Sequence, residues 1–146
     1  MLTEIWKKAI DDRQKFGALL IDLSKAFDCI SHDLLLAKME AYGFGINAIT
    51  LIGDYLSNRK QRTRIGNSYS TWHNITEGVP QGSILGPLLF NIYLRDLFYF
   101  IDQANILNYA DDTTPFSVAP TWNQVELELN RAAATIFEWL SNNYNR

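Results

Sequence analysis

The fold is decided by Ile106-Leu107-Asn108-Tyr109-Ala110-Asp111-Asp112-Thr113-Thr114-Pro115-Phe116, in which two adjacent aspartates lie between two short β-like runs. Aspartate tolerates turn backbone, so this stretch predicts a β-hairpin with both carboxylates at its tip. Neighbouring carboxylates repel each other and need compensation. One interpretation is solvation at the turn. The other is a divalent cation, since Mg²⁺ takes one or two carboxylates together with substrate phosphates.

The composition indicates one ordinary globular domain. The chain has 146 residues, 47% of them hydrophobic and 20% charged, with a net charge of -3 and a single cysteine, Cys29. These values exclude a disordered chain, an internal disulfide and a global basic field for nucleic acid. The first residues do not resemble a signal peptide. The longest apolar region, residues 84–101, contains Pro87, Arg95 and Asp96, which favours a buried helix over a membrane span. We therefore expect an intracellular protein of the cytoplasm, the nucleus or both.

The first acidic candidate is Asp22. Residues 2–14 have the apolar period of a helix, and the continuous apolar run 16–21 predicts a strand covered on both faces. This run leads directly into Asp22. A carboxylate at the end of a buried strand is costly unless it is paired or bound to metal. A strand-end turn with solvated acids remains the alternative.

A basic hairpin is expected after two helices. Ser31 is a suitable N-cap for a helix through Tyr42, and a second helix is expected over residues 47–56. Residues 59–65 alternate like a strand, residues 66–68 give a turn signal, and residues 69–75 form the return strand. The first of these strands carries four basic residues: Arg59, Lys60, Arg62 and Arg64. A solvated face is one interpretation, and contact with nucleic-acid phosphates is the other.

The third candidate is a loop between two glycines, Gly78-Val79-Pro80-Gln81-Gly82. It opens a helix with apolar residues almost all round, which we expect to run past Phe100 and to be buried. Such a loop can bind an anion or simply begin the helix. Residues 123–144 predict a long amphipathic helix. The order of elements therefore predicts an α+β fold, a mainly antiparallel sheet with helices packed on one face.

Three motifs in this order resemble the palm of reverse transcriptases, the RNA-directed DNA polymerases. Residues 16–28, which contain Asp22-Leu23-Ser24-Lys25-Ala26-Phe27-Asp28, are similar to motif A, residues 78–90 to motif B, and Tyr109-Ala110-Asp111-Asp112 to motif C. The joining sequence is similar to the enzymes of non-LTR (LINE-type) retrotransposons. A viral-type RNA polymerase palm is the weaker match, because Ala110, the Pro80-Gln81-Gly82 loop and Phe27 argue against it.

The resemblance implies a two-metal nucleotidyl transferase. Asp22, Asp111 and Asp112 would be catalytic and would hold two Mg²⁺ ions, for which Mn²⁺ can substitute, with the Leu23 carbonyl as a further ligand. Phe27 would lie under the sugar of the incoming nucleotide, and Gln81 and Gly82 would contact the nucleotide or template base. The basic residues 59–64 would face nucleic acid, and Asp28 would be structural. The implied partners are an RNA template, a DNA primer and deoxynucleoside triphosphates, with no membrane.

The resemblance also implies a partial palm over residues 1–146. The N-terminal part of the fingers, the end of motif D and the thumb are expected in the rest of a longer retroelement polyprotein. Arg95 stands where the family usually has Asn. We therefore expect the 146 residues alone to be inactive. The alternative function is a non-catalytic remnant of a retroelement polymerase that folds and binds nucleic acid weakly.

Overall fold

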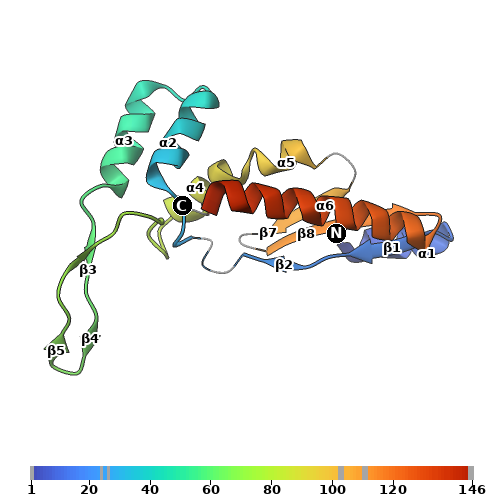
Figure 1. Ribbon diagram of the computed structural model, residues 1–146, viewed down its shortest axis with the longest axis horizontal. Coiled ribbons are helices and arrows are strands. Elements are labelled where there is room, and N and C mark those ends of the chain that lie inside the picture. The colour runs from blue at the N-terminus through green and yellow to red at the C-terminus, as the bar shows by residue number, and fades with distance from the viewer. Residues whose placement is uncertain (1, 24, 26, 102–103, 110–111, 145–146) are drawn as a thin grey trace. The chain divides into compact units, whose positions relative to one another are not determined.

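The computed structural model describes residues 2–23, 25, 27–101, 104–109 and 112–144 (Figure 1). The chain divides into two compact units, one made of residues 1–24 and 94–146 and the other of residues 25–93. The first unit contains a four-stranded sheet, and the second contains a helical hairpin and a two-stranded arm. Helices alternate with antiparallel strands, so the predicted α+β class is confirmed.

The central strand of the sheet in the first unit is β8 (Asp112–Ala119). Along one edge it pairs antiparallel with β7 (Asn105–Tyr109), which confirms the predicted hairpin around the aspartates. Along the other edge it pairs with β1 (Lys15–Ala18) and β2 (Ile21–Asp22). The run predicted as one strand covered on both faces is thus two short strands, and Leu20 between them is 81% exposed. That prediction was wrong, because an apolar run does not reveal where pairing is interrupted.

The helix α6 (Trp122–Tyr144) covers one face of this sheet (Figure 1). Its buried residues repeat with helical period, as the sequence predicted: Val125, Ala132, Ile136 and Trp139. The approach to β1 is close, since a Cβ on Gly17 would lie 2.5 Å from Val125 Cγ1. A glycine is therefore required where α6 crosses β1.

The helix α1 (Leu2–Asp11) packs on the other face. Its Trp6 ring stacks on Phe16, with ring centroids 6.4 Å apart, and Phe16 stacks on Phe116 at 6.1 Å. Neighbouring residues of a strand point to opposite faces, and Gly17 faces α6, so Phe16 faces away from it. The prediction that the helices gather on one face is therefore wrong for α1.

The second unit begins with α2 (His32–Ala41) and α3 (Ile46–Leu56), which pack side by side (Figure 1). The predicted cap is confirmed, because the Ser31 hydroxyl accepts a hydrogen bond from the Leu34 amide at 3.4 Å. The buried Lys38 ammonium donates to the Tyr93 carbonyl at 2.9 Å and thereby ties α2 to α4 (Leu85–Leu94). The scaffold helices thus form where the sequence placed them.

The helix after the glycine loop does not run past Phe100 without interruption. It ends at Leu94, and a short α5 (Leu97–Phe100) follows. Asp96 lies at the break, where its carboxylate accepts a hydrogen bond from the Trp139 indole at 3.1 Å. The predicted burial is confirmed for one side of the helix only, since Phe90 of α4 is fully buried while Leu88 is 54% exposed. None of the helices that the structure describes is both long and apolar enough to cross a membrane.

The predicted basic hairpin is confirmed as an arm made of two short ladders. The first pairs β3 (Lys60–Gln61) with β6 (His73–Asn74), and the second pairs β4 (Arg64–Ile65) with β5 (Ser68–Tyr69). The turn contains Gly66 with a φ of 60°, a conformation that glycine adopts without strain. Every residue from 60 to 74 is exposed, so the arm has no core of its own.

Candidate catalytic aspartates and nucleotide loop

Two of the three predicted catalytic aspartates lie opposite each other. Asp22 ends β2 and is paired in register with Asp112, the first residue of β8. Residues directly opposite in an antiparallel pair have Cβ atoms about 4.5–5.5 Å apart and point to the same face. Both side chains are exposed. Strand pairing therefore brings together two acids that are far apart in the sequence.

The aspartates point to the face of the sheet opposite α6, the face on which α1 packs on β1. Ser117 of β8 is buried, and its hydroxyl donates a hydrogen bond to the Glu128 carboxylate of α6. Alternation along the strand then directs Asp112 to the opposite face, together with its partner Asp22. The next residue, Thr113, is 1% exposed, as the α6 face requires. Because both side chains are exposed, the carboxylate pair can be reached by a ligand from solution.

The remaining predicted metal ligands are less fully described. Asp111 and Ala110 lie outside the described residues, between the paired Tyr109 and Asp112. Leu23 follows Asp22 with a buried side chain. Among the residues that the structure describes, no group of three acidic, histidine or cysteine side chains is placed to hold a metal ion. The described donors are therefore the two opposed carboxylates and the backbone.

In the second unit, the glycine loop is hydrogen-bonded to residues 27–30, which follow Asp22 in the chain. The Gly78 amide donates to the Ile30 carbonyl at 2.8 Å, and the Val79 amide donates to the Phe27 carbonyl at 2.8 Å. Gly78 has a φ of 77°, and a Cβ there would lie 2.7 Å from the Asp28 carbonyl oxygen. Only glycine fits this position, because the two backbones touch. Motifs A and B, as the sequence predicted them, meet at this contact.

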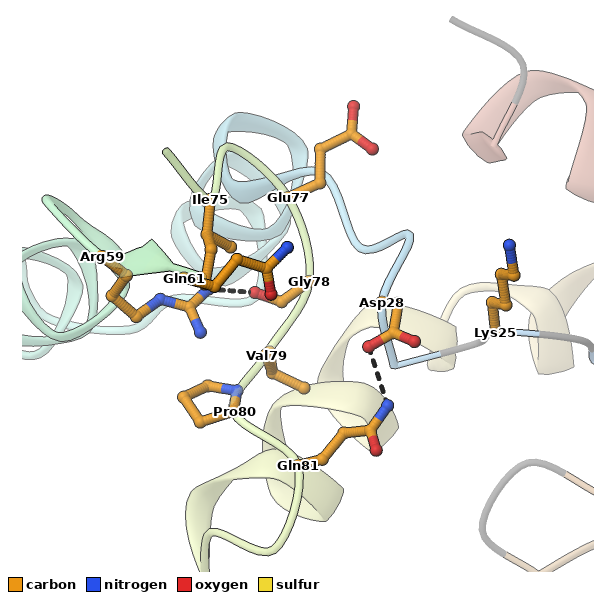
Figure 2. Close-up of a pocket in the computed structure, with 10 residues that line it drawn as sticks. All are labelled: Lys25, Asp28, Arg59, Gln61, Ile75, Glu77, Gly78, Val79, Pro80 and Gln81. Carbon is orange, nitrogen blue, oxygen red and sulfur yellow. Dashed lines mark hydrogen bonds between the residues drawn. The ribbon is translucent and has the colours of Figure 1, made fainter. Parts of the chain in front are cut away.

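A cavity of about 590 Å³ lies beside this contact. Figure 2 shows the Asp28 carboxylate and the Gln81 amide turned toward each other, and the Gln81 nitrogen donates to Asp28 Oδ1 at 2.8 Å. Arg59 reaches the same loop, where its guanidinium donates to the Gly78 carbonyl. Lys25, exposed and with a φ of 58°, also lines the cavity. The lining therefore offers cations, carboxylates and amides to a polar ligand.

The predicted nucleotide-binding residues flank this loop. Phe27 is half-buried, and its ring packs on Phe90 with centroids 4.7 Å apart. Gln81 and Gly82 are exposed, and Gly82 has a φ of 77° with open space where a Cβ would stand. Their contact with a nucleotide stays a prediction.

The four basic residues of the predicted hairpin differ in their surroundings. Arg59 is half-buried, and its Nε donates to the Leu56 carbonyl at 3.0 Å. Lys60 is exposed. Arg62 and Arg64 lie over aromatic rings of the return strand. Arg59 thus has an internal contact, and the binding of nucleic acid by all four residues stays a prediction.

The sequence did not indicate the partner of Gln81. Asp28 was expected to be structural, and its hydrogen bond holds a residue predicted to bind nucleotide. No sequence pattern predicts a role for Lys25, which lines the same cavity. No local pattern carries this information, because Asp28 and Gln81 are 53 positions apart.

Comparison with known proteins identifies the family of the chain. The family model described as "Reverse transcriptase (RNA-dependent DNA polymerase)" matches residues 3–145. Among the relatives is the "Probable RNA-directed DNA polymerase from transposon BS" of Drosophila melanogaster, which is 32% identical over 145 residues, 94% of this chain and 16% of that protein. The "Probable RNA-directed DNA polymerase from transposon X-element" of the same species is 38% identical over 112 residues, 71% of this chain and 12% of that protein.

A third relative is the "RNA-directed DNA polymerase from mobile element jockey" of Drosophila melanogaster, 28% identical over 113 residues, 73% of this chain and 12% of that protein. The chain therefore spans less than a fifth of the length of these relatives. The family model covers nearly all of it, so the resemblance predicted from the three motifs is confirmed. The chain belongs to the reverse transcriptase family.

Proposed function

We propose that this segment is the catalytic palm of an RNA-directed DNA polymerase, which extends a DNA primer on an RNA template with deoxynucleoside triphosphates. The observation that carries the proposal is the register of β2 and β8, which sets Asp22 opposite Asp112 on the face of the sheet that points away from α6. Membership of the reverse transcriptase family supports the reaction class. The relatives named as polymerases of transposons and mobile elements support the kind of element.

The donor set fits a hard divalent cation. Two exposed carboxylates face each other, and their oxygens are the ligands that Mg²⁺ and Mn²⁺ prefer. Asp22, Asp111 and Asp112, with the Leu23 carbonyl, would hold two ions. Bound there, the ions would stabilise the attacking and leaving oxygens of an in-line displacement. The residues themselves only position charge, since phosphoryl transfer needs little covalent chemistry from a protein.

The glycine loop would position the incoming nucleotide. Gln81, held by Asp28 at 2.8 Å, would offer its amide to the ribose, the phosphates or the template base, and Gly82 would let the backbone approach closely. Phe27, fixed on Phe90, would lie under the sugar. A ring in that place would exclude a 2′-hydroxyl by overlap. The amide and the ring would thus select and orient the substrate.

The test is primer extension by a chimaera in which this chain replaces the matching segment of the jockey polymerase. We expect RNA-templated DNA synthesis that requires Mg²⁺ and falls to background in Asp22→Asn. Asp54→Asn, a change of an exposed acid in α3, is the matched control and should extend normally. Normal synthesis by Asp22→Asn would contradict the proposal, and so would a chimaera that binds primer and template without extending.

The 146 residues alone are expected to give no extension. Triphosphate transfer needs cationic groups around the phosphates, and the proposal assigns these groups to other parts of the polymerase. The same assay on the short chain checks this expectation. Template-directed synthesis by residues 1–146 would contradict it.

A further inference from the structure

The arm formed by residues 60–74 carries an unexpected combination of side chains. Arg62 lies over the Tyr69 ring at 4.1 Å and over the Trp72 ring at 4.6 Å, measured from the guanidinium carbon to each ring centroid. Arg64 lies 5.5 Å from the Tyr69 centroid and is paired with Tyr69 across the ladder. These four residues, Arg62, Arg64, Tyr69 and Trp72, are called the arm platform below.

The arm platform is open to solvent and strongly cationic. Tyr69 is 50% exposed and Trp72 is 58% exposed, although large aromatic rings are costly to leave in water. No Asp or Glu lies between Asp54 and Glu77, while the chain as a whole has a net charge of -3. The arm is therefore positively charged although the whole chain has a net negative charge, and its positive charge complements a polyanion.

The arm does not gain stability from burial. Each ladder has two residue pairs, and every residue from 60 to 74 is exposed. An isolated two-stranded hairpin is at best marginally stable in water. The aromatic rings and guanidinium groups on this exposed arm are better explained by contact with a ligand than by packing within the protein. A packing role alone would favour apolar neighbours over stacked arginines.

We infer that the arm platform binds single-stranded nucleic acid by stacking unpaired bases on Tyr69, Trp72 and the Arg62 guanidinium, while Lys60 and Arg64 contact phosphates. Every base has a π-face, so recognition of this kind tolerates any sequence. Duplex bases are already stacked on each other and offer no free face to the rings. This inference deepens the proposed function. It rests on the proposed function only for the identity of the bound strand, which would be an RNA template or a DNA primer.

The test measures binding of the 146-residue chain to fluorescent oligonucleotides by anisotropy. The ligands are an oligothymidylate of about 12 nucleotides, within the usual site sizes for such surfaces, and an abasic chain with the same phosphates. Stacking predicts that wild type binds the abasic chain at least about fivefold more weakly. Equal affinity for the two ligands would overturn the inference, and this comparison needs no variant to fold.

Variants locate the binding. Tyr69→Leu/Trp72→Leu keeps all charges and should lose at least about fivefold in affinity for oligothymidylate, with the salt dependence of wild type, because the phosphate contacts remain. Trp122→Leu is the matched control, since Trp122 is 61% exposed on α6, and it should bind as wild type does. Wild-type affinity in the double variant, or tighter binding of a duplex than of oligothymidylate, would overturn the inference.

The outcome separates this inference from the proposed function. Asp22→Asn should leave oligothymidylate binding unchanged while it abolishes extension by the chimaera. If extension survives Asp22→Asn, the polymerase proposal fails and the arm platform is judged by its own binding data. If the ring variants bind normally, the arm platform fails and the polymerase proposal stands.

Discussion

At the scale of single residues, Asp22 and Asp112 should destabilise the fold when no cation is bound. Like charges directly opposite in an antiparallel pair repel, at a cost of about 0.2–1 kcal/mol. Asp22→Asn removes this repulsion and should raise the melting temperature in EDTA by about 1–3 °C. Thermal unfolding followed by circular dichroism measures the change. Asp54→Asn should melt with wild type, and a lower melting temperature for Asp22→Asn would contradict the repulsion.

Phe27 should act as a gate against ribonucleotides. Its ring is half-buried on Phe90, so one part of it is still available to a substrate. In the active chimaera, Phe27→Val should improve the use of ribonucleotides relative to deoxynucleotides at least about tenfold, or ~1.4 kcal/mol of discrimination. Single-nucleotide incorporation with each kind of substrate measures the ratio.

Folding provides the control for Phe27. Truncation of a buried Phe to Ala costs roughly 3–5 kcal/mol, and truncation to Val costs less. A change of selectivity with little loss of stability would support the gate. A much lower melting temperature of Phe27→Val with an unchanged preference for deoxynucleotides would assign Phe27 to the core.

Asp28 should act by positioning Gln81. The Asp28 carboxylate accepts a hydrogen bond from the Gln81 side-chain amide at 2.8 Å. A hydrogen bond to a charged group contributes about 1.5–3 kcal/mol to stability. In the chimaera, Asp28→Ala should raise the KM for deoxynucleotide about tenfold or more. Asp28→Asn keeps an acceptor and should rescue most of the loss. Adding Asp28→Ala to Gln81→Ala should have little further effect, and full additivity would show that the two residues act independently.

At the scale of elements, two glycines should respond to alanine in opposite directions. A Cβ on Gly17 would overlap Val125 Cγ1 at 2.5 Å, so Gly17→Ala should force α6 and β1 apart at a cost of about 1–3 kcal/mol. Gly53 lies inside α3, where a Cβ would meet Leu36 Cδ1 at an ordinary 3.6 Å. Gly53→Ala should therefore stabilise the chain by about 0.5–1 kcal/mol.

Urea unfolding of both variants beside wild type measures these free energies. A Gly17→Ala variant as stable as wild type would mean that α6 does not approach β1 as closely as the structure has it. Destabilisation by Gly53→Ala would contradict the description of α3. Comparison of Gly17→Ala with Gly53→Ala also separates the effect of packing from the general effect of replacing glycine by alanine.

At the scale of the whole molecule, local signals predicted most elements and few of their contacts. The N-cap residue Ser31 and the helical period of apolar residues predicted α2, α3 and α6, and the turn at Gly66 predicted the arm. The break at Leu20, the position of α1 and the exposure of Leu88 on α4 could not be predicted. Each depends on which faces other segments cover, and a single sequence does not record this.

The same division holds for the candidate site. The sequence named Asp22 and Asp112, but only the register of β2 and β8 sets them opposite each other, 90 positions apart. The sequence also named Gln81 and Arg59, while their partners Asp28 and Gly78 emerged only from the fold. The residues were predictable because three motifs resemble those of the reverse transcriptase family. Pairings were not, because they depend on tertiary structure.

The most direct test of the central claim, that Asp22 and Asp112 belong to one divalent-metal site, is paramagnetic broadening by Mn²⁺ in amide NMR spectra of the 146-residue chain. We predict that the signals of Leu23, Asp112 and Thr113 broaden first, that excess Mg²⁺ restores them, and that Asp22→Asn abolishes the effect. Asp54→Asn should behave as wild type does. Broadening centred on other acidic residues, with the signals of β2 and the start of β8 unchanged, would contradict the account.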